Sequence, residues 1–118
     1  MNKEKYLKVL WGIVVVTALA EAVCGKKYMK RIGNRLKVLD REAVIEVWVG
    51  VHNLIRPDKS ISTGNSAFAH SPIVKAESQL IVEKITSRFN PKLPNLDARL
   101  KDIIKRKSKN IYNELSDH

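Results

Sequence analysis

The longest run of hydrophobic positions lies near the N-terminus. Residues 9–20 read VLWGIVVVTALA without a charged side chain, and 17 residues separate Lys8 from Lys26. At 1.5 Å per residue these form about 26 Å of helix, slightly less than the roughly 30 Å hydrocarbon core of a bilayer, and long lysine stems can span the difference. The pattern therefore predicts a transmembrane signal-anchor over residues 9–25, preceded by a basic tail over residues 1–8.

Two other interpretations of this segment stay open. Ala20, Glu21 and Ala22 form the small-x-small pattern that signal peptidase requires, so the segment could be cleaved after Ala22. It could also be the buried core helix of a soluble protein, because its length is short for a membrane span. An uncleaved anchor is favoured, because the run is long for a signal sequence and because Lys26 and Lys27, which hinder export, follow closely.

A basic block follows the apolar run. Residues 25–37 read GKKYMKRIGNRLK and hold six lysines or arginines but no acidic side chain. Such charges are typical of the flank that fixes the orientation of a membrane span. They could also bind anionic lipid headgroups, at about 1 kcal/mol per charge. The residues expected to do so are Lys26, Lys27, Lys30 and Arg31.

The segment after the basic block shows helical periodicity. Asp40 is a suitable N-cap for a helix over residues 41–55, which Pro57 would end. The apolar face of that helix would hold Val44, Val47, Trp48, Val51 and Ile55. A strand over residues 44–51 is the competing interpretation, because β-branched residues dominate there and apolar positions alternate. Helix is favoured, and residues 26–56 are expected to form a juxtamembrane basic segment followed by an amphipathic element.

Two further helices are predicted towards the C-terminus. Residues 57–70, PDKSISTGNSAFAH, lack periodicity and are expected to form a flexible loop. A Ser-Pro pair at 71–72 begins a helix that should end near residue 88, the prolines of NPKLPN (90–95) break the chain, and a second helix should run from 96 to about 115. Residues 71–118 are therefore expected to form a helical hairpin. The apolar side chains expected to pack are Ile73, Leu80, Ile81, Ile85 and Phe89 in the first helix and Leu96, Leu100, Ile103, Ile104, Ile111 and Leu115 in the second.

The composition sets the scale of the fold. The chain has 118 residues, 44% of them hydrophobic, and 22 basic against 12 acidic side chains give a net charge of +10. This length allows one domain and excludes a large multidomain enzyme, and the ordinary apolar fraction argues against wholesale disorder. The expected fold is mainly α: a single N-terminal transmembrane helix followed by a small helical extramembrane region with a flexible loop.

The sequence offers little chemistry of a catalytic kind. Its five glycines are scattered and form no phosphate-binding loop, and its three histidines lie apart, without an HExxH motif or a Cys/His cluster. Cys24 is the single cysteine, which excludes an internal disulfide, and burial as a small hydrophobe is favoured over an intermolecular bridge or acylation. We therefore expect no catalytic residue, no metal site and no cofactor.

The last predicted helix is amphipathic and basic. Ile103 and Ile111 lie on its apolar side, and Lys105, Arg106 and Lys107 lie on the remaining surface. A solvated charged face is the simplest interpretation. The helix could instead lie on an anionic bilayer with its apolar side among the headgroups, which makes these five residues candidates for membrane or partner binding. Nucleic-acid binding is the least favoured interpretation, because aromatic residues that could stack on bases are scarce.

The order of these elements resembles the inner-membrane subunit of a phage spanin, the lysis complex that links the inner and outer membranes. The resemblance lies in the lysine-bearing tail over residues 3–8, the apolar span over residues 9–24 and the helices over residues 71–115. It implies a periplasmic soluble part that meets an outer-membrane lipoprotein partner and draws two bilayers together. It also implies that lysines around Lys105 contact anionic lipid and that apolar helix faces carry the packing, at Ile73, Leu80, Ile85, Ile103 and Ile111.

The charge distribution supports a different orientation. Three lysines precede the span and six lysines or arginines follow it closely, which by the positive-inside rule favours a cytoplasmic C-terminal part. The chain would then be a membrane-tethered cytoplasmic adaptor whose basic helices bind an acidic protein or nucleic acid. Both orientations in the inner (cytoplasmic) membrane stay open, and the apolar helix faces make a homodimer a further hypothesis.

Overall fold

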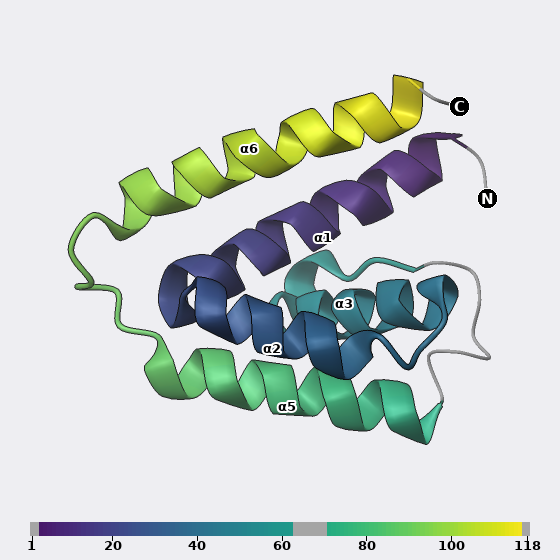
Figure 1. Cartoon of the computed structure of the whole chain (residues 1–118), viewed down its shortest axis with the longest axis horizontal. Helices are drawn as coiled ribbons and strands as arrows, with labels where there is room; N and C mark the ends of the chain where they lie inside the picture. The colour runs from purple at the N-terminus through teal and green to yellow at the C-terminus, as the bar shows by residue number, and fades with distance from the viewer. Residues whose placement is uncertain (1–2, 63–70, 117–118) are drawn as a thin grey trace.

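The protein is a bundle of helices (Figure 1). The computed structural model describes residues 3–62 and 71–116, with side chains for residues 4–62 and 71–110. Its elements are α1 (Lys3–Cys24), α2 (Lys26–Leu36), α3 (Arg41–Ile55), the 3-10 helix η1 (Pro57–Lys59), α5 (Pro72–Arg88) and α6 (Leu96–Ser116). No strand occurs in the two described ranges. The prediction of a mainly α fold is therefore confirmed, and α3 is a helix rather than the competing strand.

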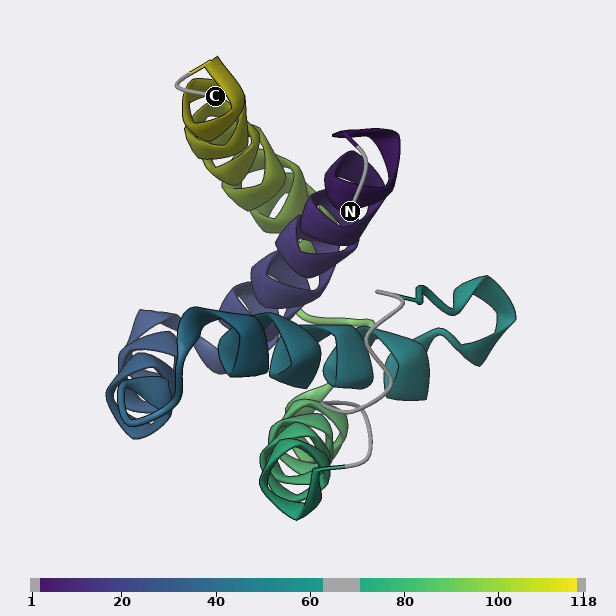
Figure 2. The same ribbon diagram turned by 90° about the vertical axis from the view of Figure 1, so that its right-hand side faces the viewer.

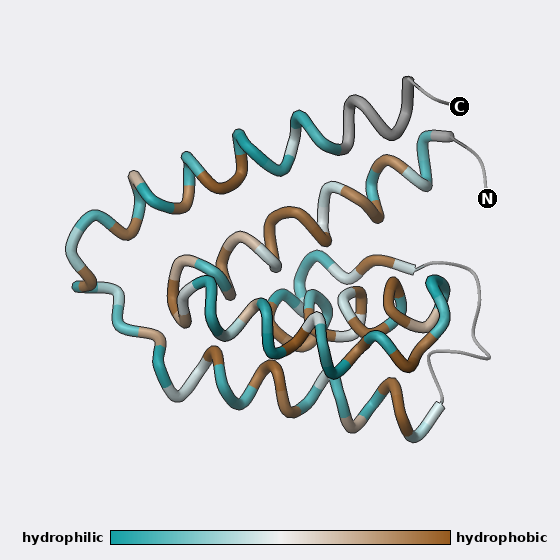
Figure 3. Tube along the Cα trace, in the orientation of Figure 1, coloured by the Kyte–Doolittle hydropathy of each residue, from teal (hydrophilic) through white to brown (hydrophobic). Residues whose placement is uncertain are grey.

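Helix α1 lies at the centre of the bundle. It contacts α6 on one side and α2, α3 and α5 on the other, as Figures 1 and 2 show. Hydrophobic residues dominate the middle of α1, whereas hydrophobic and hydrophilic residues alternate along α5 and α6 (Figure 3). Among the described helices, only α1 is long and apolar enough to cross a membrane, and half of its most apolar stretch is buried in the bundle. A helix that is apolar all round needs such cover from protein or from lipid.

The buried side chains form two clusters on different sides of α1. The main core contains Val16, Ala20, Ile32, Leu36, Val47, Trp48, Val51, Val74, Ile81 and Ile85. A smaller cluster, which we call the α1–α6 contact, joins Ala18 and Ala22 of α1 to Ile103 of α6, and Leu96, Leu100 and Ile104 pack against it. Residues two positions apart point to nearly opposite sides of a helix, so α1 uses one side for each cluster.

The basic block forms a helix, α2, which the sequence pattern did not predict. Gly25 separates it from α1 with a positive φ of 89°, a backbone conformation that favours glycine. Ile32 and Leu36 are buried in the main core, and the partly buried Tyr28 and Met29 pack against it. This short apolar stripe is hidden in the sequence by the six cations around it, and it becomes a packing face only because α1 and α3 lie beside it.

Helix α3 begins where the sequence predicted. The Asp40 carboxylate accepts a hydrogen bond from the Ala43 backbone N–H (2.7 Å), which caps the helix. Val47, Trp48 and Val51 are buried, as the helical periodicity predicted. These side chains pack between α1 and α5. Burial in the core therefore outweighs the strand preference of the β-branched residues in this segment.

The chain after α3 returns towards α1. The Asn53 side-chain N–H donates to the Ile61 carbonyl, and the Ile61 backbone N–H donates to the Asn53 side-chain oxygen, both at 2.8 Å. A Cβ at Gly12 in α1 would clash with the Ile61 side chain, so glycine permits this close approach. The predicted flexible loop covers residues 57–70, of which residues 63–70 lie outside the described part of the chain.

Helix α5 buries only part of the predicted face: Ile81 and Ile85 are buried as expected. Ile73, Leu80 and Phe89 were expected to pack, but Ile73 is 57% exposed and Leu80 is 46% exposed, and Phe89 is exposed as well. The buried residues are Val74, Ser78, Ile81 and Ile85. Ser78 completes this stripe because its hydroxyl donates to the Val47 carbonyl of α3 (3.0 Å), so that a small polar side chain is satisfied inside the core.

Helices α5 and α6 do not pack on each other as the sequence-predicted hairpin over residues 71–118 would require. They are connected by residues 89–95, but α1 lies between them: α5 packs chiefly on α3, whereas α6 packs on α1 (Figures 1 and 2). The physical reason is the apolar surface of α1, which offers α6 the alanines of the α1–α6 contact. Small residues allow the close approach of two helices.

Candidate functional site

The exposed end of α1 combines apolar and basic side chains. Trp11 is 53% exposed and Leu7 is also exposed, and the exposed Lys5 and Lys8 lie beside them. A tryptophan next to lysines is typical of the interface between membrane and water. This end of α1 therefore has one outward-facing side, whereas Val9 and Leu10 are buried in the bundle.

Glu21, the acidic residue in the apolar part of α1, is paired with α6. Its carboxylate lies 2.5 Å from the Arg106 guanidinium, and its side chain is only 12% exposed. Burial lowers the pKa of the nearby Lys107 ammonium; the Glu21 carboxylate opposes this effect and the Arg106 charge adds to it. Arg106 and Lys107 were predicted to face a membrane or a partner, but they lie at the junction of α6 with α1.

Ile103, Lys105 and Ile111 were the other predicted binding residues of α6. Ile103 is buried against Ala18 and Ala22, so within the bundle it packs on the chain itself. Lys105 is exposed and remains accessible to a ligand. The backbone of Ile111 belongs to α6, but its side chain lies outside the described residues. The predicted binding face of α6 is thus divided between an internal contact and an exposed cation.

Helix α2 carries the four predicted lipid-binding residues of the basic block, Lys26, Lys27, Lys30 and Arg31, which we call the basic face of α2. All four side chains are exposed. Within the described part of the chain none of them makes an ion pair, whereas Arg35 on the same helix donates two hydrogen bonds to the Glu77 carboxylate of α5 (2.9 and 2.7 Å). The four cations therefore form a positively charged surface that starts two residues after the end of α1.

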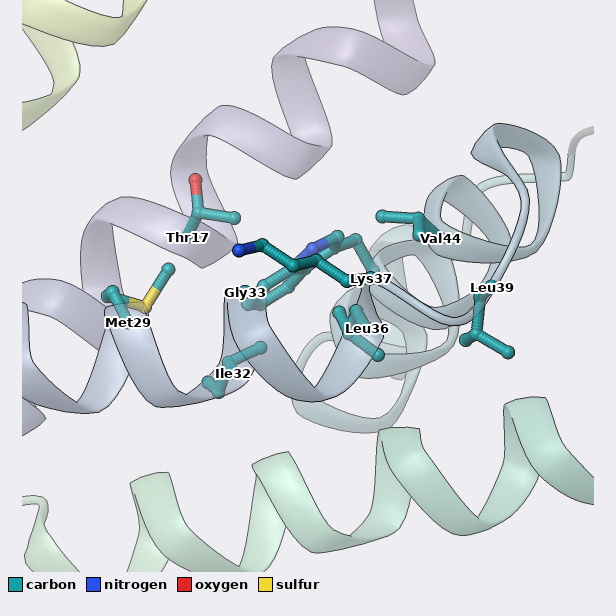
Figure 4. Close-up of a pocket in the computed structure, with 9 residues that line it drawn as sticks. Thr17, Met29, Ile32, Gly33, Leu36, Lys37, Leu39 and Val44 are labelled. Atoms are coloured by element: carbon teal, nitrogen blue, oxygen red, sulfur yellow. The ribbon is translucent and has the colours of Figure 1, made fainter.

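A pocket between α1, α2 and α3 was not predicted from the sequence (Figure 4). Its volume is about 400 Å³, and its walls include Thr17, Met29, Gly33, Lys37, Val44 and Trp48. These residues come from three helices, so no local pattern brings them together. The one sequence signal is Gly33, an exposed residue without a side chain in a helix that otherwise carries mostly long ones.

Cys24 and His52 have structural surroundings. Cys24 is partly buried, and its sulfur lies 3.9 Å from the Lys84 carbonyl, which agrees with its interpretation as a small hydrophobe. His52 is buried and its Nδ1 lies 3.1 Å from the Asn53 side-chain oxygen. Within residues 4–62 and 71–110 no group of three or more His, Cys, Asp or Glu side chains is placed to hold a metal ion.

Comparisons with protein-family models, with curated proteins and with solved structures find no match to this chain. Its function has to be inferred from its own residues and their arrangement.

Proposed function

We propose that the protein is a single-pass membrane protein anchored by α1, and that the compact bundle is the form in which α1 is shielded from water. The observation that supports this most is the coverage of α1. The helix is long and apolar enough to cross a bilayer, yet the other helices bury only half of its most apolar stretch. A bilayer would cover the whole stretch, since lipid tails are as apolar as the leucines of a protein core.

The composition of the two clusters supports an exchange of α1 between the bundle and lipid. Only two of the ten buried residues of the main core, Val16 and Ala20, belong to α1. The other eight belong to α2, α3 and α5, and the extensive contact between α3 and α5 can persist when α1 leaves. The α1–α6 contact has three buried residues and one ion pair, and α6 packs chiefly on α1, so α6 would lose most of its cover when α1 leaves.

The basic face of α2 supports a position at an anionic membrane surface. Its four exposed cations follow the end of α1 after the single residue Gly25. Each cation near such a surface contributes about 1 kcal/mol of attraction. The anchor and the cations would then act together, because the span holds the charged face close to the headgroups.

Beyond membrane anchoring, we propose a spanin-like role for the protein. It would be an inner-membrane phage lysis subunit whose helices link or fuse the inner and outer membranes. The order of a basic tail, an apolar helix and two connected C-terminal helices supports it. When α1 enters lipid, the apolar face of α6 around Ile103 loses its cover. That face would then pack on an outer-membrane lipoprotein partner or on a second copy of the chain.

The cytoplasmic adaptor is the second candidate, and the basic face of α2 favours it. Cations on that side of a span are typical of cytoplasmic flanks. In this orientation the exposed cations of α2 and Lys105 of α6 would bind an acidic protein or nucleic acid.

Fractionation of cells that express the full-length chain tests the membrane proposal. The wild-type chain should stay in the membrane pellet after an alkaline wash and float with lipid vesicles. Val15→Lys places a charge near the middle of the span, at a partly buried position outside both clusters, and should move much of the chain to the soluble fraction. A lysine at a helix centre costs about 2.5–3.5 kcal/mol of insertion.

Leu80→Lys is the matched control, because it adds the same charge at an exposed position of α5. It should leave the chain in the membrane fraction. Wild-type protein that neither stays in the membrane pellet nor floats with vesicles, or equal partitioning of the two variants, would contradict the proposal.

A reporter enzyme fused after His118 distinguishes the spanin-like role from the cytoplasmic adaptor. Activity confined to the periplasm supports the spanin-like role, and in that case Ile103→Glu should abolish lysis while the chain still inserts. Activity confined to the cytoplasm supports the adaptor and rules out the role in linking two membranes.

A further inference from the structure

We propose that the pocket between α1, α2 and α3 binds one free fatty acid. Its volume of about 400 Å³ lies within the range of small-molecule sites, which are mostly apolar with a few polar groups that orient the ligand. Apolar side chains make most of its wall, and Lys37 is the single charged residue among those that line it. One hydrocarbon chain with one negative charge at its end complements this arrangement.

Lys37 provides the charge recognition. Figure 4 shows its side chain lying along the pocket, with its nitrogen towards Thr17. Within the described part of the chain Lys37 has neither an ion pair nor a side-chain hydrogen bond, and no acidic residue lines the pocket. A carboxylate would therefore supply the missing partner of this ammonium group. Lys30, two turns before Lys37 on the same side of α2, adds a second exposed positive charge nearby.

The rest of the wall is suited to a hydrocarbon chain. The Thr17 hydroxyl donates to the carbonyls of Ile13 and Val14 (2.8 and 3.2 Å), so its one hydrogen-bond donor is used within α1. The space beside Gly33 is open, because a Cβ at that position would meet no atom within 4 Å. The buried Trp48 contributes an aromatic wall from α3.

A single chain fits better than a two-chain phospholipid. The pocket has one cation on its wall and a volume at the low end of the range for ligand sites. A second acyl chain would have to lie outside it, over the exposed cations of α2. A free fatty acid matches both the space and the charge.

Binding would also affect the anchor, a consequence that rests on the proposed function. Thr17 of α1 forms part of the wall, so the complete pocket exists only while α1 is packed against α2 and α3. A ligand that binds one of two conformations stabilises that conformation by mass action. A fatty acid would therefore hold α1 in the bundle and oppose its insertion into lipid.

Contact quenching of tryptophan fluorescence tests the binding directly. The chain has two tryptophans, so Trp11→Phe leaves Trp48 in the pocket wall as the only one. This variant is titrated with dibromostearic acid in buffer without lipid or detergent, because bromine quenches tryptophan only at short range. We expect saturable quenching at one fatty acid per chain, and its reversal by unbrominated stearic acid.

The reciprocal variant detects adsorption to exposed apolar surface. Trp48→Phe leaves Trp11, which is 53% exposed and lies on α1 outside the residues that line the pocket. Its quenching should be much weaker and should not saturate at one fatty acid per chain. Equal quenching of the two tryptophans would overturn the proposal.

Substitutions in the pocket sharpen the test. Gly33→Leu should fill the pocket and abolish quenching of Trp48, and Gly33→Ala is the matched control that leaves most of the space. Lys37→Met should weaken binding about two- to fivefold, as expected for one exposed ion pair, while Lys101→Met, at an exposed position of α6, should not. Unchanged affinity in both Gly33→Leu and Lys37→Met would overturn the proposal.

The fatty-acid proposal and the membrane proposal can be tested separately. Gly33→Leu leaves α1 unaltered, so it should still float with vesicles if α1 is the anchor. Loss of flotation in the wild type together with normal fatty-acid binding would reject the anchor alone. Normal flotation without Trp48 quenching would reject the fatty-acid site alone.

Discussion

The Arg106 guanidinium of α6 lies 2.5 Å from the Glu21 carboxylate of α1, between residues 85 positions apart in the chain. Glu21 is the one acidic residue of α1 after Glu4 in its first turn. A buried carboxylate without a partner is costly in a protein and more so in lipid. The pair therefore satisfies the charge that interrupts the apolar part of α1, and it fastens α6 to that helix.

The Glu21–Arg106 pair should show a measurable but modest coupling energy. Glu21→Gln and Arg106→Gln should each destabilise the bundle, and the double variant should be less destabilised than the sum of the two. We expect a coupling of about 0.5–1 kcal/mol, because the Arg106 side chain is 47% exposed. Urea unfolding followed by circular dichroism measures it. Additive effects of the two substitutions would show that the contact contributes nothing to stability.

Lys107→Met should stabilise the bundle near neutral pH, and the gain should shrink at high pH. Burial lowers the pKa of Lys107 in the folded chain below the unfolded value of 10.5. Between those two pKa values the unfolded chain binds more protons, so wild-type stability rises with pH in that window. The measurement is the difference in unfolding free energy between variant and wild type from pH 7 towards pH 10.5. A difference that does not change with pH would contradict this account.

Gly50 and Gly33 should respond in opposite ways to alanine. A Cβ at Gly50 of α3 would lie 2.6 Å from the Ser78 hydroxyl oxygen of α5, so Gly50→Ala should force the two helices apart and destabilise the bundle by about 1–3 kcal/mol. Gly33→Ala meets no atom within 4 Å and should stabilise α2 by about 0.5–1 kcal/mol. Thermal unfolding of the two variants checks the contrast. Ser78→Gly should restore part of the loss in the Gly50→Ala background.

Neighbouring residues of α5 should differ sharply in their contribution to stability. Ile81 is buried in the main core, so Ile81→Ala should cost about 2–5 kcal/mol. Leu80 is 46% exposed, so Leu80→Ala should cost about 0.5 kcal/mol or less. Urea unfolding of both variants tests which face of α5 is inside. Similar losses of stability at the two positions would indicate that Leu80 is buried as well, as the sequence analysis predicted.

Much of the secondary structure could be predicted because its signals are local. The Asp40 cap and the periodicity of residues 44–55 identify α3, and the Ser-Pro pair at 71–72 and the prolines of residues 90–95 place the ends of α5 and α6. The helix α2 could not be predicted in this way. Its apolar stripe of Ile32 and Leu36 is short and surrounded by cations. It is buried only because residues of α1 and α3 pack on it.

The candidate site was predictable only in part for the same reason. The exposed cations of α2 follow from a charged run, whereas the pocket combines Thr17, Gly33 and Trp48 from three helices. Ile103 and Arg106 were recognised as important side chains of α6, but their neighbours in α1 could not be read from spacing.

By itself, the sequence determined that the chain is helical, basic and equipped with one apolar helix near its N-terminus, because caps, prolines and periodicity act over a few residues. Tertiary structure alone decided that α1 is enclosed between α6 and the other helices, that Ser78 lies inside α5's buried face, and that a pocket opens over Gly33. These features depend on contacts between residues far apart in the chain. Such contacts are selected by the free energy of packing the whole bundle, which no local pattern records.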